Sequence, residues 1–85
     1  MQQYISSNRI GKNIRRIRKK CGMRAVDVIT RLHVDYDYEI NCYDFSRIEN
    51  NHRDVSLELA SKLICLFGST YDELVLGKFD EGKDG

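Results

Sequence analysis

Hydrophobic side chains recur at helical spacing along most of the chain. The first such stretch places four side chains on one helical face, at positions i, i+4, i+7 and i+11: Ile10, Ile14, Ile17 and Cys21. Asn8 stands where an N-cap is expected, and Gly22 stands where a glycine commonly ends a helix. The pattern therefore predicts a first helix over about residues 9–21.

The same spacing predicts two helices in the middle of the chain. A short second helix over residues 24–32 would bury three side chains, Val28, Ile29 and Leu32. Residues 33–40 carry three acids and two tyrosines without a helical period, so we expect a loop there. A third helix over residues 41–50 has Asn41 as its expected N-cap and two inward side chains, Phe45 and Ile48.

Two further helices are predicted in the C-terminal part of the chain. Ser56 is the expected N-cap of a fourth helix, which ends before Gly68 and buries Leu59, Leu63 and either Leu66 or Phe67. Thr70 and Glu73 have the spacing of a capping box at the start of a short fifth helix. Five helices without a strand or a repeat predict an all-α domain over 9–77, between a flexible N-terminus (1–8) and a polar tail (78–85).

The composition fits one small domain. Of the 85 residues, 41% are hydrophobic, enough for a single core, and the mean hydropathy is -0.52. No apolar run approaches the roughly 18 residues of a membrane span, and no signal-peptide pattern is present. The three cysteines are widely spaced and odd in number, which favours reduced thiols and a cytoplasmic location.

The net charge of +1 conceals a strong asymmetry along the chain. Residues 25–60 carry three basic and eight acidic side chains. Residues 1–24 carry no acid and eight basic side chains: Arg9, Lys12, Arg15, Arg16, Arg18, Lys19, Lys20 and Arg24. Such a basic segment is typical of a surface that meets a polyanion, although a solvated basic helix would have the same composition.

Four short motifs, which follow one another along the chain, indicate the type of helical domain more specifically. Residues 10–22 (IGKNIRRIRKKCG) resemble the first helix of the phage-repressor helix-turn-helix family, also called Cro/CI-type, lambda-repressor-like or XRE. Residues 45–50 (FSRIEN) resemble the end of that family's recognition helix, 55–60 (VSLELA) its fourth helix, and 71–74 (YDEL) its common ending. The resemblance implies a five-helix lambda-repressor-like fold that binds DNA, with no cofactor.

A recognition helix over residues 41–50 would present its outer side chains to base edges in the major groove. Because Phe45 and Ile48 face inward, we expect base contacts from the opposite side, from Cys42, Tyr43, Ser46 and Arg47. Arg47 can form two hydrogen bonds to guanine, and Tyr43 can contact a thymine methyl group. In the alternative interpretations, Arg47 is a surface arginine paired with an acid and Cys42 is a small, partly buried filler.

Contacts to the phosphate backbone are expected from six side chains: Lys12, Arg15, Arg16, Arg24, Asn50 and Arg53. Arg18 and Glu49 match positions at which the family forms an ion pair between the first and third helices. The resemblance therefore implies a pair that sets the angle of the recognition helix, the alternative being two independent surface charges.

The chain departs from the family pattern in three ways. Arg24-Ala25 stands where the family usually has Ser-Gln at the start of the second helix. The turn between helices 2 and 3 is lengthened by about six residues, 35–40, and a longer turn of this kind implies that Ile40 packs back into the core. Finally, four acids and no base surround the element expected to enter DNA: Asp35, Asp37, Glu39 and Asp44.

An enzyme is not expected. His33 and His52 are isolated, no glycine-rich phosphate loop is present, and the acids of residues 35–44 lack the spacing of a calcium loop. We expect no metal and no cofactor.

The sequence thus predicts a sequence-specific DNA-binding regulator, a repressor or an antitoxin, acting as a homodimer. Leu76 and Phe79 are the expected dimer contacts, because four of the six positions 74–79 are apolar (Leu74, Val75, Leu76 and Phe79), too many for so short a helix to bury. The alternative is that Leu74 and Val75 complete the monomer core while Leu76 and Phe79 fray with the polar tail over residues 80–85. A different class of function is a protein-interaction adaptor on the same fold, docking through the acidic 35–44 loop without binding DNA.

Overall fold

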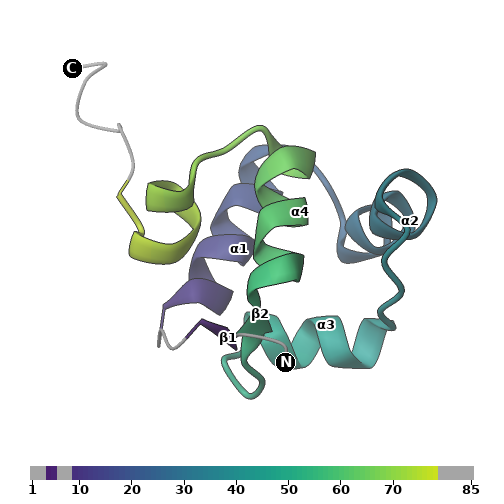
Figure 1. Ribbon diagram of the computed structural model, residues 1–85, viewed down its shortest axis with the longest axis horizontal. Helices are drawn as coiled ribbons and strands as arrows, with labels where there is room; N and C mark the ends of the chain where they lie inside the picture. The colour runs from purple at the N-terminus through teal and green to yellow at the C-terminus, as the bar shows by residue number, and fades with distance from the viewer. Residues whose placement is uncertain (1–3, 6–8, 79–85) are drawn as a thin grey trace.

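The computed structural model describes residues 4–5 and 9–78 (Figure 1), and this part of the chain is mostly helical. Its elements, in chain order, are β1 (Tyr4–Ile5), α1 (Ile10–Lys20), α2 (Ala25–Tyr36), α3 (Cys42–Glu49), β2 (Val55–Ser56), α4 (Leu57–Phe67) and the short π-helical turn η1 (Asp72–Leu76). The predicted all-α class is confirmed, apart from the two short strands.

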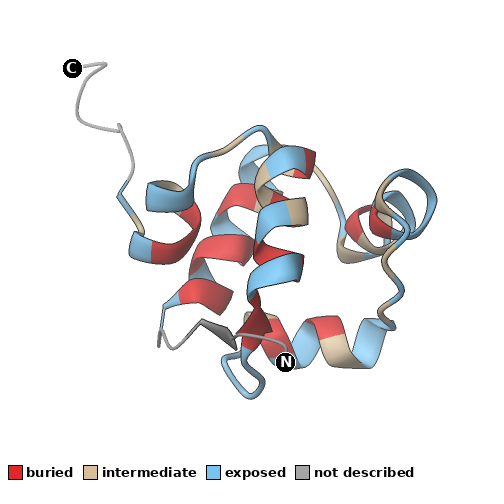
Figure 2. Cartoon of the chain, in the orientation of Figure 1, coloured by how far each residue is buried: buried red, intermediate tan, exposed pale blue. Residues whose placement is uncertain are grey.

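The helices enclose one core. α1 packs against α3 and η1, while α2 packs against α3 and α4. In Figure 1, α3 lies along the lower edge of the molecule, with α2 at the right and η1 at the left. Figure 2 colours parts of each of these helices as buried, and much of α3 as exposed. The outward face of α3 is therefore accessible.

The predicted stripe of α1 is correct except at its last position. Ile10, Ile14 and Ile17 are buried, but Cys21 is exposed. α1 ends at Lys20, so Cys21 is its C-cap and lies at the edge of the core, with its Sγ 3.9 Å from the Phe67 carbonyl oxygen. Gly22 follows with φ +70, the left-handed conformation that glycine adopts most readily.

The predicted end of the second helix is wrong. α2 continues to Tyr36, four residues beyond the predicted end, and turns at Asp37 with φ 52. Two contacts explain the extra turn: Arg31 Nε bonds Asp35 Oδ2 at 2.7 Å, and Lys62 Nζ of α4 donates to the Tyr36 carbonyl oxygen at 3.0 Å. The connection between α2 and α3 is therefore only residues 37–41.

A strand pair corrects the prediction that the chain has no strand. β1 and β2 pair antiparallel, with Tyr4 opposite Ser56 and Ile5 opposite Val55. Residues 4–5 thus form part of the fold, although the whole segment 1–8 was expected to be flexible. Two-residue strands are too short to produce the alternation that reveals a strand in a sequence.

The predicted helix starts are confirmed at three sites. The Asn41 side chain accepts from Asp44 N at 2.7 Å, and Ser56 Oγ accepts from Leu59 N at 3.1 Å. Thr70 and Glu73 form both bonds of a capping box, each 3.1 Å long. Asn8, the expected cap of α1, lies outside the described residues.

In the described part of the chain, no helix has the length and apolar run needed to cross a bilayer.

Candidate nucleic-acid interface

The C-terminal end of α3 is fixed to α1 by a forked ion pair. Arg18 Nε donates to Glu49 Oε2 at 2.7 Å and Arg18 Nη2 donates to Glu49 Oε1 at 3.0 Å, while Nη1 donates to the Met23 carbonyl oxygen at 3.0 Å. The two side chains are only 13% and 9% exposed. The hydrogen bonds that Arg18 donates to Glu49 raise the pKa of Arg18 above its ordinary value. The predicted pair between helices 1 and 3 is confirmed.

A second contact holds the same end of α3 close to α1. Gly11 N donates to Asn51 Oδ1 at 3.2 Å, and a Cβ at position 11 would collide with the backbone carbonyl oxygen of Ile48. Glycine is therefore required here because two backbones approach closely. Together with the ion pair, this contact fixes the angle between α3 and the rest of the core.

The outward face of α3 carries the predicted base-contacting side chains, and all four are exposed: Cys42, Tyr43, Ser46 and Arg47. Tyr43 is 71% exposed, and the Arg47 guanidinium lies 5.8 Å from the centre of its ring, within cation–π range. Arg47 Nη2 donates to the His52 carbonyl oxygen at 3.2 Å, not to an acid, so its charge is not neutralised by this contact. The filler interpretation of Cys42 is wrong because its side chain is exposed.

Asn50 lies on the same face, one turn after Ser46. Its Nδ2 donates to the Ser46 carbonyl oxygen at 3.0 Å and lies 3.4 Å from Ser46 Oγ. The amide therefore caps α3 from its side and would have to rotate to contact a phosphate group.

Two of the predicted phosphate ligands are already paired with carboxylates. Arg24 Nη2 and Asp27 Oδ1 lie 3.1 Å apart, and Arg24 N also donates to Asp27 Oδ2 at 2.8 Å. Both bonds lower the pKa of Asp27, and the bond from the Arg24 side chain has the larger effect. Arg53 Nη1 lies 3.1 Å from Asp44 Oδ2, at the start of α3. Each arginine thus contributes less positive potential than its formal charge suggests.

The three predicted phosphate ligands on α1 are exposed but point in different directions. Gly11 and Arg18 mark the side of α1 that contacts α3. Because an α-helix turns about 100° per residue, Arg15 points about 50° from that side, Lys12 about 110° and Arg16 about 150°. The fold therefore brings Arg15 nearest to α3 and turns Lys12 and Arg16 away from it.

Lys12 and Arg16 belong to a broader basic face of α1, which consists of Arg9, Lys12, Arg15, Arg16 and Lys19. These side chains line an open hollow of about 570 Å³ that is completed by Asn13 and Gly77. Asn13 Nδ2 donates to the Leu74 carbonyl oxygen at 2.9 Å, which places the hollow next to η1. Arg9 and Lys19 were not among the predicted ligands, although their helical spacing from Lys12 and Arg16 indicates the same side.

The expectation of four acids without a base around α3 is wrong. Asp35 pairs with Arg31 at 2.7 Å, Asp44 pairs with Arg53 at 3.1 Å, and Glu39 Oε2 lies 3.8 Å from His33 Nδ1. The extension of α2 brings Arg31 within one turn of Asp35, and the fold brings Arg53 to Asp44. The negative charges of Asp35 and Asp44 are therefore compensated by arginines.

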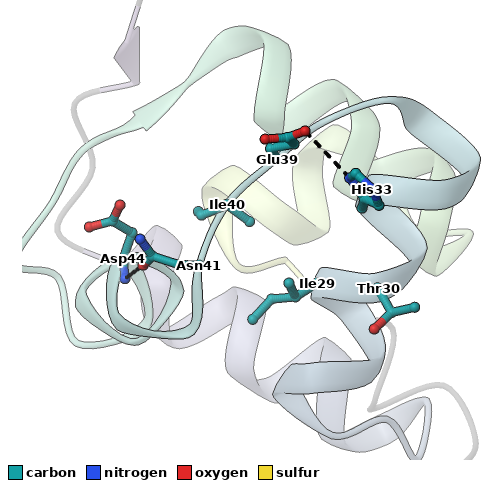
Figure 3. A pocket seen from close by; sticks show the side chains of 7 residues that line it. All are labelled: Ile29, Thr30, His33, Glu39, Ile40, Asn41 and Asp44. Atoms are coloured by element: carbon teal, nitrogen blue, oxygen red, sulfur yellow. Dashed lines mark hydrogen bonds and ion pairs between the residues drawn. The ribbon is translucent and has the colours of Figure 1, made fainter.

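The α2–α3 connection borders an open hollow of about 620 Å³ lined by Ile29, Thr30, His33, Glu39, Ile40, Asn41 and Asp44 (Figure 3). Ile40 is half-buried and packs against the core, as the resemblance implied. The polar side chains His33 and Glu39 lie at one side of this hollow, and Asn41 and Asp44 at another. The hollow thus combines an apolar floor with polar edges.

The predicted dimer surface is only partly present in the described residues. Leu74 and Val75 are buried in the monomer core, at 0% and 7% exposure. Leu76 is 50% exposed, and Tyr71, beside the same turn, is 49% exposed. Phe79, the other expected contact, lies outside the described residues.

Within the described residues, no group of three or more His, Cys, Asp or Glu side chains could hold a metal ion. No protein-family model, curated protein or solved structure matches the chain. The resemblance to phage-repressor proteins therefore rests on the four motifs and the contacts described above.

Proposed function

We propose that the chain is a sequence-specific DNA-binding regulator with a lambda-repressor-like arrangement, in which α3 enters the major groove. The observation that carries this proposal is that α3 is attached to α1 on one side and exposed on the other. One side is anchored by the Arg18–Glu49 pair and the Gly11 contact, and the other exposes Tyr43, Ser46 and Arg47. A rigid helix with an exposed polar face is what base recognition in the major groove requires.

Arg47 is the main base-reading side chain in this proposal. Its guanidinium can donate two hydrogen bonds to O6 and N7 of a guanine, at the expense of its single bond to the His52 carbonyl oxygen. Tyr43 supports the Arg47 side chain through its ring face and can contact a thymine methyl group. Ser46, between them, can donate to or accept from a base edge.

Arg15 and Arg53 are the proposed phosphate ligands closest to α3, with Arg24 and Asn50 at its margins. Arg24 and Arg53 are held by Asp27 and Asp44, so their positions are preorganised while their charges are partly cancelled. We therefore expect a modest electrostatic contribution from these two residues and a larger one from Arg15 of α1, a helix that contains no acid.

In this proposal the protein represses transcription by occupying its DNA site, and two copies of it bind as a pair. One domain of this size covers few base pairs, so two half-sites about one helical turn apart would provide the specificity. Leu76 and Tyr71, both half-exposed on the side of η1, are the proposed contacts of the second copy. An antitoxin would use the same DNA-reading surface.

The experiment is a comparison of Arg47→Ala with Lys20→Ala, the loss of another exposed cation, which lies on α1 beside Phe67. A preferred site is first selected from random duplexes, and binding is then measured across salt concentrations. Arg47→Ala should lose about 1–3 kcal/mol on the selected site and relax the preference at one base pair. Equal behaviour of both variants on selected and random DNA would refute the assignment of α3.

A second candidate function is a protein-interaction adaptor, favoured by the hollow beside the α2–α3 connection. Its apolar floor at Ile29 and Ile40 could receive a side chain of a partner protein. Weak DNA binding without salt dependence would favour the adaptor, whereas a steep salt dependence would favour DNA. Ile40→Ser is not a useful probe because Ile40 also packs against the core.

A further inference from the structure

The outward side of α3 is formed by a small set of polar side chains. The buried side chains Phe45 and Ile48 mark the inward direction, and an α-helix turns about 100° per residue. Four exposed side chains therefore lie within about 50° of the direction opposite the core: Tyr43, Ser46, Arg47 and the C-cap Asn50. Tyr43 and Asn50 lie closest to that direction, within about 10°. Asn50 thus points as directly outward as Tyr43.

The Asn50 amide is oriented by α3 itself. Its Nδ2 donates to the Ser46 carbonyl oxygen at 3.0 Å and lies 3.4 Å from Ser46 Oγ. Because a carbonyl oxygen only accepts hydrogen bonds, the amide nitrogen must face Ser46 and Oδ1 must face elsewhere. The two hydrogens of Nδ2 have their acceptors in these two contacts. In this orientation Asn50 has no donor left for a ligand.

The oxygen of the same amide is unused. Asn50 Oδ1 accepts no hydrogen bond from the described part of the chain, and the residue is exposed. The neighbouring Asn51 differs, because its Oδ1 accepts from Gly11 N at 3.2 Å and so belongs to the contact between α1 and α3. Asn50 therefore offers a free acceptor on the outward side of α3.

A free acceptor does not suit the phosphate backbone, because phosphate oxygens are acceptors as well. In the major groove, by contrast, two base atoms carry hydrogens that an amide oxygen can accept: N6 of adenine and N4 of cytosine. Arg47 on the same side of α3 has only donors to offer, which suit the acceptors of guanine. Asn50 supplies the complementary half of such a reading surface.

We propose that Asn50 reads a base, with Oδ1 accepting a hydrogen bond from the exocyclic amino group of adenine or cytosine. This inference rests on the proposed function, since it requires α3 to enter the major groove. It gives Asn50 a base contact in place of a phosphate contact, which the amide could make only after leaving Ser46.

The test is a cycle of changes in the protein and in the DNA. In the site selected from random duplexes, adenine is replaced by purine, or cytosine by pyrimidin-2-one, at one position at a time. Each replacement deletes the exocyclic amino group alone. Binding of the wild type, Asn50→Ala and Arg53→Ala is then measured on every duplex. Arg53 is the control because its proposed contact is to a phosphate.

For the wild type, deletion of one particular amino group should weaken binding about fivefold, the effect of one neutral hydrogen bond. For Asn50→Ala the same deletion should change binding by less than about twofold, because the amino group has already lost its partner. Arg53→Ala should bind every duplex more weakly and keep the fivefold effect. The base that carries the amino group distinguishes adenine from cytosine.

Asn50→Asp separates the oxygen of the amide from its nitrogen. The carboxylate keeps an acceptor and has no donor, so the effect of the amino deletion should remain. Repulsion by the phosphates should lower the affinity for all duplexes alike. Melting followed by circular dichroism verifies that both Asn50 variants remain folded, since each loses the bond to the Ser46 carbonyl oxygen.

Three results would overturn the inference. The first is that Asn50→Ala removes the effect of no amino deletion. The second is that Asn50→Ala weakens binding to all duplexes equally, as the loss of a phosphate contact would. The third is that Asn50→Asp abolishes the effect of the amino deletion, because the nitrogen would then make the contact. Failure of the proposed function is recognised separately, since Arg47→Ala would then leave every base preference unchanged.

Discussion

The two ends of α3 are held in different ways. The C-terminal end is fixed by the nearly buried Arg18–Glu49 fork and by the backbone contact at Gly11, both of which join it to α1. The N-terminal end is held by the exposed cap Asn41 and by the Arg53–Asp44 pair, next to an open hollow. Long-range contacts thus set the direction of the helix, while local and surface contacts set its start.

This difference has a functional consequence under the proposed function. A helix that reads bases needs a fixed angle, and the anchored end provides it, while the exposed N-terminal end can adjust to the partner. Substitutions at the anchored end should therefore cost more stability than substitutions at the N-terminal end, and their order tests the comparison.

The largest effect is expected for Glu49→Ala. The change leaves the Arg18 guanidinium almost buried, with the Met23 carbonyl oxygen as its remaining hydrogen-bond partner in the described part of the chain, at a cost of about 3–5 kcal/mol. The double variant Arg18→Met with Glu49→Leu should recover much of that stability, because no unpaired charge remains. Thermal and urea denaturation of the two single variants and the double variant measure this. Additive losses in the double variant would show that the pair contributes no coupling energy.

A smaller loss is expected for Gly11→Ala. Alanine is the better helix former, but its Cβ would meet the Ile48 carbonyl oxygen, so α1 and α3 must move apart. We expect a loss of about 1–3 kcal/mol by urea denaturation, as for other overpacked sites. Thr30→Ala on the exposed face of α2 is the control. A stabilised Gly11→Ala protein would mean that the two helices do not approach as closely as described.

Removal of the cap at the other end should cost less. Asn41→Ala deletes the bond from Asp44 N at 2.7 Å on an exposed surface, with an expected loss of about 1 kcal/mol. Asn41→Ser, which preserves a capping oxygen, should restore most of it. If Asn41→Ala were as costly as Glu49→Ala, the contrast between the two ends of α3 would not hold.

The smallest effect concerns pH and the start of α2. Arg24 lowers the pKa of the Asp27 carboxyl below its ordinary value of 3.8. A carboxyl whose pKa is lower in the folded state stabilises the protein above its unfolded pKa, and this contribution disappears as the pH falls through the folded value. Wild type and Asp27→Asn should therefore differ in melting temperature above about pH 4 and converge below it. A constant difference across pH 2–6 would contradict this account.

Local interactions explain which features could be predicted from the sequence. The caps Asn41 and Ser56, the Thr70–Glu73 box and the glycine at Gly22 act within a few residues, so the pattern revealed them. The inward positions of α3 followed from its helical period. Because Phe45 and Ile48 are buried, the exposure of Tyr43, Ser46 and Arg47 followed as well.

Contacts between distant segments decided the remaining features. The bond from Lys62 of α4 to the last turn of α2 and the strand pair, which joins residues about 50 positions apart, have no local signal. The Arg31–Asp35 pair in that same turn is local, with i, i+4 spacing. The Arg18–Glu49 pair was anticipated from a resemblance and not from the residues themselves. The required approach of Gly11 to Ile48 became visible only when the two helices were packed together.

The sequence by itself determined the helical class, most helix starts and the concentration of basic residues before position 25. Tertiary structure decided which charges remain available, since Arg24 and Arg53 acquire carboxylate partners while Lys12 and Lys19 do not within the described residues. It also decided the direction in which each basic side chain points relative to α3. The physical reason is that helical periodicity fixes angles within one helix, whereas the angles between helices arise from packing in the core.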